Sequence, residues 1–317
     1  MKWKKLGKIF SPLEYSLNKT YIGYAQSPQV LIFDDFIRIY FSIREESKNG
    51  KFISHIQYVD MTKDFNVINT SQHDVISLGE LGCYDEHGIF PINILKFNNK
   101  VYAYLSGWSR RVSVSVETGI GLAMSDDNGK TFQRLGNGPV LSSSINEPYL
   151  VVDGFVKVYN EVFHMWYIYG TDWIKNNPNS EAERTYKIGH ATSLDGIIWE
   201  KENKQIIEDS MAYECQALPT VIRIKDRYHM YFAYRNTFDF RDNPNNGYRL
   251  GYAYSDDLST WTRDDKNVGI ELSKNGWDSN MMSYPHIFEF NNAVYMLYNG
   301  NNFGKDGFGL AKLESTN

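Results

Sequence analysis

The feature that most constrains this 317-residue chain is a structural unit that recurs five times. In each copy a proline leads a short apolar strand, a turn follows, and a second strand alternates in polarity. The clearest copy lies between Met211 and Tyr234. The prolines are Pro28, Pro91, Pro148, Pro219 and Pro285, which lie 63, 57, 71 and 66 residues apart. A sheet tolerates proline at the first residue of a strand, so each proline is expected to mark the start of one.

Each copy continues with a third strand, and the first four copies add a fourth at residues 65–68, 132–135, 199–201 and 261–263. The fifth copy stops after three strands, and we expect the N-terminal segment Trp3–Phe10 to supply the missing one. Such a strand closes a ring and removes an exposed sheet edge.

Four antiparallel strands in each repeat predict an all-β chain that folds as a five-bladed β-propeller. We expect residues 1–317 to form a single domain, with the N-terminal strand 3–10 completing the last blade. The predicted blades span residues 21–70, 84–136, 146–202, 213–264 and 277–313. Two β-sandwiches are the alternative, but they do not explain why five copies share one pattern.

Composition and charge exclude several classes of protein. The formal net charge is −5, and no run of Lys and Arg suggests a surface for nucleic acid. Two cysteines are too few for a disulfide framework, which favours a reducing compartment. The start, MKWKKLGKIF, lacks the apolar region of a secretory signal, and no apolar run is long enough to span a membrane. We therefore expect a soluble, cytoplasmic protein whose oligomeric state the sequence leaves open.

The turns between third and fourth strands carry a motif of their own. The segment Ser125–Phe132 fits the Asp-box pattern S-x-D-x-G-x-T-aromatic, and Ser193–Trp199 and Ser255–Trp261 are variants of it. Aspartate accepts local backbone hydrogen bonds and glycine supplies a positive φ, which are the needs of a tight turn. Because the motif recurs in every middle blade, we interpret these acids as structural.

The residues just before the prolines are the candidates for chemistry. In a propeller the loops that lead into the innermost strands gather at one mouth of the channel, and four of these five loops carry a carboxylate. The acids are Asp85, Glu86, Glu147, Glu214 and Asp278. Crowded carboxylates raise one another's pKa, so that one stays protonated while another is ionised. Cleavage of a glycosidic bond needs such a pair.

This pattern resembles the five-bladed glycoside hydrolases, the superfamily of arabinanases, β-xylosidases, invertases and mannoside phosphorylases. Glu214-Cys215 is similar to the Glu-Cys acid of invertase-like members. The resemblance implies that Glu214 is the acid, Asp85 the nucleophile or base, and Glu147 a tuning residue, although the family has Asp there. An arabinanase-like register makes Glu147 the acid, but its base is then missing, because the first blade carries Gln26 and no Asp.

A second set of residues is predicted to bind substrate. Trp108 and Trp173 are candidates for stacking on a sugar ring, and the fork-shaped donors Arg44 and Arg235 suit a carboxylate or phosphate. The remaining candidates are Gln26, His87, Tyr284, His286 and Asn299. The two arginines suggest an anionic sugar or a nucleotide sugar, although they also suit the neutralisation of the nearby acids.

No cofactor is expected. The histidines show neither HxxH nor HExxH spacing, which argues against a dedicated zinc site. The sequence leaves open whether a Ca²⁺ ion or water fills the central channel. Cys215 is interpreted as a small buried side chain and not as a nucleophile.

The sequence thus predicts a glycosidase-like enzyme that acts on a glycosidic or glycosyl-phosphate bond, with Asp85 and Glu214 as its principal carboxylates. The first alternative is a glycan-binding propeller without catalysis, which the missing first-blade Asp favours. The second is an enzyme of polysaccharide biosynthesis that transfers glycosyl groups or processes nucleotide sugars, with Arg44 and Arg235 binding the nucleotide sugar. The expected partner is a carbohydrate or sugar-nucleotide ligand.

Overall fold

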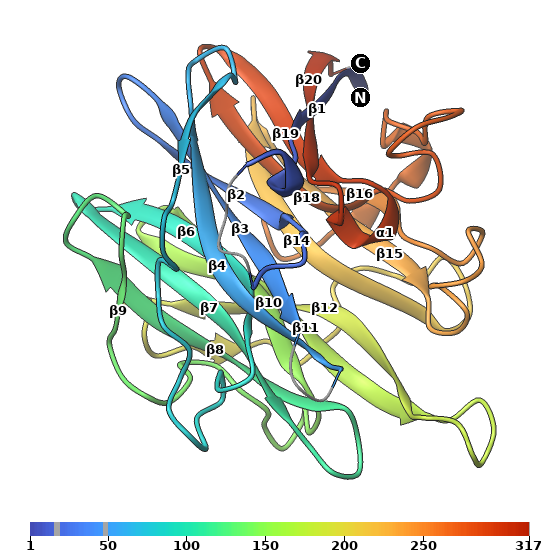
Figure 1. The fold of residues 1–317 in the computed structure, drawn as a ribbon. Coiled ribbons are helices and arrows are strands. Elements are labelled where there is room, and N and C mark those ends of the chain that lie inside the picture. Colours follow the sequence, from blue (N-terminus) through green and yellow to red (C-terminus); the bar gives the residue numbers. More distant parts are fainter. Residues whose placement is uncertain (16–19, 47–49, 317) are drawn as a thin grey trace.

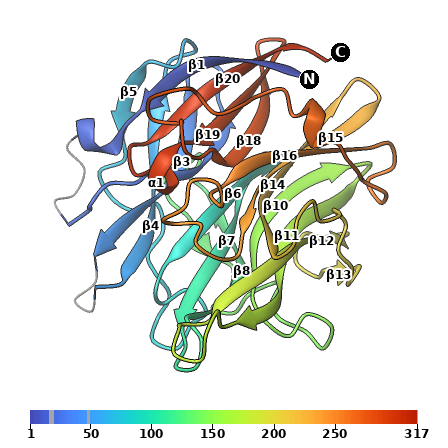
Figure 2. The same cartoon turned by 90° about the vertical axis from the view of Figure 1, so that its right-hand side faces the viewer.

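The computed structural model describes residues 1–15, 20–46 and 50–316, so residues 47–49 of the predicted first blade lie outside the described residues. The described chain forms five antiparallel sheets of four strands each, which confirms the predicted five-bladed propeller. Figures 1 and 2 show the blades arranged around a common centre.

The blades share one strand order from the centre outward. The innermost strands are β2 (Gln26–Ile32), β6 (Ile89–Phe97), β10 (Val151–Tyr159), β14 (Glu214–Ile224) and β18 (Ser283–Phe290). The second strands are β3 (Ile37–Glu46), β7 (Lys100–Arg110), β11 (Val162–Ile174), β15 (Arg227–Asn236) and β19 (Ala293–Asn299). The third strands are β4 (Phe52–Met61), β8 (Val116–Ser125), β12 (Glu183–Ser193), β16 (Arg249–Ser255) and β20 (Phe308–Ser315).

The fourth strands are short, except in the last blade. Four of them are β5 (Val67–Thr70), β9 (Gln133–Arg134), β13 (Glu200–Lys201) and β17 (Thr262–Arg263). The fifth is the N-terminal strand β1 (Lys2–Phe10), which pairs antiparallel with β20, so the two chain ends lie side by side (Figure 1). The predicted closure is therefore confirmed. Three short helices complete the described elements, namely η1 (Pro12–Glu14), η2 (Asp265–Asn267) and α1 (Asn301–Gly304).

The core consists of five hydrophobic clusters, each filling the space between two neighbouring blades. Each blade therefore packs on both of its faces. This explains why the second strands are buried almost without alternation, as in β3, where the first seven residues are all buried. The turns after the third strands are held as expected for tight turns, since Asp127 Oδ1 accepts the backbone N–H groups of Lys130 and Thr131 at 2.9 Å.

Side chains of the innermost strands also join neighbouring blades around the channel. Among the described residues, three hydrogen bonds run from a backbone N–H of one innermost strand to a side chain of the innermost strand in the preceding blade. These bonds run from Val30 to His286 Nε2 (3.3 Å), from Val156 to Asn93 Oδ1 (2.9 Å) and from Ile287 to Thr220 Oγ1 (3.2 Å). Asn93 Nδ2 donates in turn to Gln29 Oε1 at 3.1 Å. The blades are thus held together by directional bonds as well as by apolar contact.

The closing strand can be tested at Trp3. This side chain is 7% exposed, and its Nε1–H donates to the Tyr231 hydroxyl of β15 at 2.9 Å, which ties β1 to the fourth blade. We expect Trp3→Ala to lower the free energy of unfolding by about 3–5 kcal/mol, because it leaves a cavity and removes the hydrogen bond to Tyr231, whose hydroxyl keeps only the Val268 carbonyl as partner. Urea denaturation measures this. Leu6→Ala on the same strand, where the side chain is 45% exposed, is the control. Equal effects of the two variants would contradict this role for Trp3.

Candidate active site

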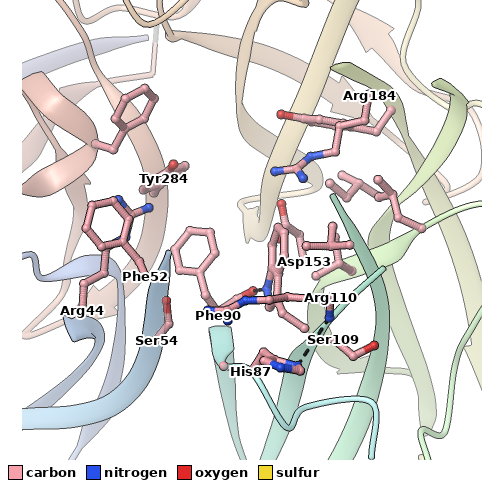
Figure 3. A pocket seen from close by; sticks show the side chains of 18 of the residues that line it. Arg44, Phe52, Ser54, His87, Phe90, Ser109, Arg110, Asp153, Arg184 and Tyr284 are labelled. Atoms are coloured by element: carbon pink, nitrogen blue, oxygen red, sulfur yellow. Dashed lines mark hydrogen bonds between the residues drawn. The ribbon is translucent and has the colours of Figure 1, made fainter. Parts of the chain in front are cut away.

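A pocket of about 320 Å³ opens at one end of the channel, and residues of all five blades line it, so it lies on the propeller axis. Its wall is rich in aromatic rings, and Figure 3 shows part of it. Five arginines line the pocket, namely Arg44, Arg110, Arg184, Arg235 and Arg241. Asp153 is its single carboxylate among the described residues. A cationic cavity in a chain of net charge −5 favours an anionic ligand.

Four of the five acids expected at the channel mouth, namely Asp85, Glu147, Glu214 and Asp278, do not line this pocket. Each is at most 2% exposed, and each forms an ion pair with a cation on the fourth strand of its own blade. The pairs are Asp85 with Arg134 Nε (3.0 Å), Glu147 with Lys201 (2.5 Å), Glu214 with Arg263 (2.6 Å) and Asp278 with Lys5 (2.7 Å). A catalytic role for these acids stays a prediction, whereas the expected convergence on the pocket is not found.

The same cations also bind the loop that carries each acid into its blade. They donate to the carbonyl oxygens of Ser77, Ser142 and Glu208 and to Ser273 Oγ, at 2.6, 2.6, 2.7 and 3.0 Å respectively. We call these four arrangements the loop clamps. In the second blade the incoming loop lies so close to the sheet that Tyr84 and Asp85 occupy the space where a Cβ at Gly107 would stand. The clamps fix the loops that lead into the innermost strands.

Other predicted residues divide between the pocket and its surroundings. Arg44, His87, Trp108, Arg235 and Tyr284 line the pocket, and their role in binding stays a prediction. Gln26, Glu86, Trp173, His286 and Asn299 do not.

The contacts of this second group explain their positions. Gln26 Nε2 donates to Phe303 O at 2.7 Å, and Glu86 accepts the N–H of Gly82 at 2.9 Å. Asn299 accepts the N–H of Ser27 at 2.8 Å, Trp173 packs against an apolar cluster, and His286 lines the cavity at the opposite end of the channel.

Asp153 is the pocket residue that the sequence reasoning missed. It lies in β10 at a bulge between Val152 and Phe155, where its φ is +59°. Each innermost strand has such an irregularity, and bulges redirect side chains next to functional sites. The prediction began the third blade's strand at Pro148, but Pro148 precedes the turn at Asn160 by twelve residues, whereas Pro219 precedes its turn at Lys225 by six. Counting back from the turn would have led to Asp153-Gly154.

Burial raises the pKa of Asp153 to about 7, although a Leu218 backbone N–H and the charge of Arg184 act in the opposite direction. Figure 3 shows Asp153 beneath Arg184. The residue is 4% exposed, and among the described residues no ion pair involves it. A carboxyl group with these properties is protonated in part at neutral pH and suits proton transfer.

Arg235 is the most enclosed cation of the pocket. It is 2% exposed, its guanidinium lies 3.5 Å from the Phe240 ring centroid, and Nη2 donates to the Tyr186 hydroxyl at 2.9 Å. Its Nε–H is buried without a partner among the described residues, and no described carboxylate pairs with it. Because a buried charge without a counter-ion is unfavourable by several kcal/mol, an anion bound in the pocket would stabilise this arrangement.

Among the described residues, no cluster of three or more His, Cys, Asp or Glu side chains could hold a metal ion. Nor does any helix formed by these residues have the length and apolar character needed to cross a bilayer.

The loop clamps predict a large effect of breaking one. Glu214 is fully buried, so Arg263→Met should leave an unpaired charge and lower the free energy of unfolding by about 3–5 kcal/mol. The double variant Glu214→Gln/Arg263→Met should recover much of this loss. Arg227→Met, which breaks an exposed pair with Asp256, is the control and should cost at most about 1 kcal/mol. Urea denaturation of the wild type, Glu214→Gln, Arg263→Met and the double variant gives the coupling energy between the two side chains. Similar losses in Arg263→Met and Arg227→Met would argue against the clamp.

The raised pKa of Asp153 predicts how stability depends on pH. Between about pH 4 and pH 7 the folded protein holds a proton that the unfolded chain has lost, so stability falls as the pH rises through this window. Asp153→Asn removes the effect. The free energy of unfolding of Asp153→Asn, relative to that of the wild type, should therefore rise by up to roughly 1.4 kcal/mol per pH unit in this window and stay constant above it. Denaturation at several pH values measures the difference, and a pH-independent difference would refute the assignment.

Comparison with known proteins gives the chain its relatives. No family model matches it. It is 30% identical over 319 aligned positions to an uncharacterized Mycobacterium tuberculosis protein, MT1551 in strain CDC 1551 and Rv1502 in strain H37Rv, with 99% of this chain and 100% of that protein covered. A β-1,2-mannobiose phosphorylase of Thermoanaerobacter sp. is 27% identical over 174 residues, which are 52% of this chain and 53% of that protein.

Solved structures with the same fold are glycoside hydrolases. A complex of BT0996 with RGII has a TM-score of 0.75 at 14% identity, and the match covers 98% of this chain and 92% of that protein. An endo-arabinase of Bacteroides thetaiotaomicron has a TM-score of 0.65 at 13% identity, covering 93% and 95%. A GH43_1 enzyme of Xanthomonas citri in complex with xylose has a TM-score of 0.61 at 15% identity, covering 92% and 88%. The chain belongs to the family of the mycobacterial protein MT1551/Rv1502, and it has the five-bladed propeller fold of the GH43-type glycoside hydrolases.

Proposed function

We propose that the chain transfers a glycosyl group between a carbohydrate and inorganic phosphate, with Asp153 as the proton donor and pocket arginines binding the phosphate. The observation that carries this proposal is the composition of the axial pocket. It combines one buried carboxyl group with five arginines. The fold of the glycoside hydrolases supports a carbohydrate as the other ligand.

The single carboxyl group favours phosphate over water as the attacking group. Hydrolysis of a glycosidic bond in the usual way needs two carboxyl groups, one as acid and one as base or nucleophile. The pocket holds only Asp153 among its described residues. Phosphate is already an anion at neutral pH, so it attacks without a protein base. Its negative charge must be neutralised by cations for it to bind in the pocket, and arginine binds phosphate in a bidentate manner.

The proposed step balances in protons and bonds. An oxygen of hydrogenphosphate attacks the anomeric carbon, the bond from that carbon to the glycosidic oxygen breaks, and Asp153 gives its proton to the departing oxygen. The products are a glycosyl phosphate and a free sugar hydroxyl. The proton that the hydrogenphosphate carried is released and restores Asp153. The reverse reaction forms a glycosidic bond from the glycosyl phosphate.

Two arginines are suited to the phosphate. Arg184 acts on the charge of Asp153, and Arg235 is a buried cation without a carboxylate partner among the described residues. A phosphate that neutralises both would lie on the side of the pocket formed by the third and fourth blades, to which these arginines belong. The match of half the chain to a β-1,2-mannobiose phosphorylase supports the same chemistry.

One observation also suits a glycan-binding propeller without catalysis. A pocket with one carboxylate lacks the acid–base pair of a hydrolase, and a protein that only binds glycans needs no such pair. This candidate predicts saturable binding of sugar without product. The arginines suit a nucleotide sugar as well, which predicts binding that depends on the diphosphate.

The proposal is tested by incubating the protein with phosphate and a panel of disaccharides that includes β-1,2-mannobiose, followed by mass spectrometry of glycosyl phosphates. Asp153→Asn should lower the rate by at least about 100-fold, because the leaving oxygen loses its proton donor. Asp126→Asn, which changes an exposed acid outside the pocket, is the matched control.

Three outcomes would overturn the proposal. The first is release of free sugar without any need for phosphate. The second is full turnover in Asp153→Asn. The third is loss of turnover in folded Asp85→Asn and Glu214→Gln proteins while Asp153→Asn stays active, which would assign catalysis to the acids predicted from the sequence.

A further inference from the structure

Arg44 is a pocket cation that the proposed reaction leaves without a task. It lies at the end of β3 in the first blade, and Figure 3 shows it beside Phe52, across the pocket from Arg184. Of the pocket arginines, Arg184 acts on the pKa of Asp153, and Arg44 does not. A phosphate held near Asp153 would therefore leave Arg44 on the opposite wall.

The surroundings of Arg44 orient it without neutralising it. Its guanidinium lies 4.4 Å from the centroid of the Tyr24 ring and 4.9 Å from that of Phe52. Its backbone N–H donates to Gly23 O at 3.2 Å, and its carbonyl accepts the N–H of Ile22 at 2.9 Å. Aromatic faces hold a guanidinium by cation–π attraction but supply no negative charge.

Glu45 and Glu46 follow Arg44 in the chain, and among the described residues neither forms an ion pair with it. Glu45 follows it directly, but successive side chains of a strand point to opposite faces, and Glu45 Oε2 lies 3.0 Å from His55 Nε2. Among the described residues, no carboxylate forms an ion pair with Arg44. The guanidinium is thus packed, oriented and uncompensated in a pocket of small-molecule size.

We infer that the carbohydrate substrate itself carries an acidic group, a carboxylate or a phosphate ester, and that Arg44 binds this group. The inference rests on the proposed function in that it gives Arg184 and Arg235 to the inorganic phosphate. The planar fork of arginine matches either acid by two parallel hydrogen bonds. Phe52 and Phe90, which line the pocket, offer apolar faces for the sugar ring beside that group.

The test measures binding by calorimetry for pairs of sugars that differ only in their acidic group. The probes are glucose and glucuronate, galactose and galacturonate, mannose and mannuronate, and mannose 6-phosphate, each in saturating inorganic phosphate. At least one acidic sugar should bind 10-fold or more tightly than its neutral partner. Arg44→Gln should abolish this preference, Arg44→Lys should retain part of it, and the phosphate ester distinguishes the two kinds of acid.

Inorganic phosphate alone is titrated separately, so that the two proposals can fail independently. Arg111→Gln is the control, because Arg111 is exposed, lies outside the pocket and pairs only loosely with Glu117. The inference is overturned if no acidic sugar binds more tightly than its neutral partner, or if the preference survives in folded Arg44→Gln protein. Failure of the wild type to bind phosphate, with the Arg44-dependent preference intact, would overturn the proposed phosphorolysis and uphold the inference.

Discussion

The buried ion pair between a loop and the fourth strand of the same blade is the interaction on which this structure most depends. Four blades use it, and in each the cation also holds the backbone or a hydroxyl of the incoming loop. In each of these four blades a long loop precedes the innermost strand, and the ion pair holds that loop against the fourth strand. A charge buried with its partner is tolerated, whereas either one left alone is strongly unfavourable. The pairs therefore fix the loops in place, because moving a loop would separate two buried charges.

The clamps determine what remains for the axial pocket. Because Asp85, Glu147, Glu214 and Asp278 are each neutralised inside a blade, they contribute no negative charge to the pocket wall. The wall is left with arginines, aromatic rings and Asp153. The bulge in each innermost strand then decides which side chain reaches the axis. The fold is that of the glycoside hydrolases, and the arginines of its pocket are the ground on which we propose an anionic co-substrate instead of a water molecule activated by a second carboxylate.

The same clamps show what the sequence could not indicate about the surroundings of these acids. The argument that several buried carboxylates are not mere packing is sound, since each needs compensation. The compensating cations, however, come from strands about 50 residues later, and in the last blade from Lys5 at the opposite end of the chain. No pattern in the sequence around Glu214 indicates that Arg263 is its partner. In the third blade Pro148 also lies in the loop and not in the strand. The strand start was therefore placed too early, and Glu147 was named as the site residue instead of Asp153.

The number of blades, their strand order and the closure by the N-terminal strand could be predicted from the sequence, because alternation of polarity, turn residues and repeat length are local properties of the chain. The sequence also identified Arg44, His87, Trp108, Arg235 and Tyr284, which line the pocket. The identity of the carboxyl group that faces the axis, by contrast, emerges only from the folded chain. That choice depends on bulges and on ion pairs between residues distant in sequence, and neither leaves a local pattern, since desolvation is settled by three-dimensional packing alone.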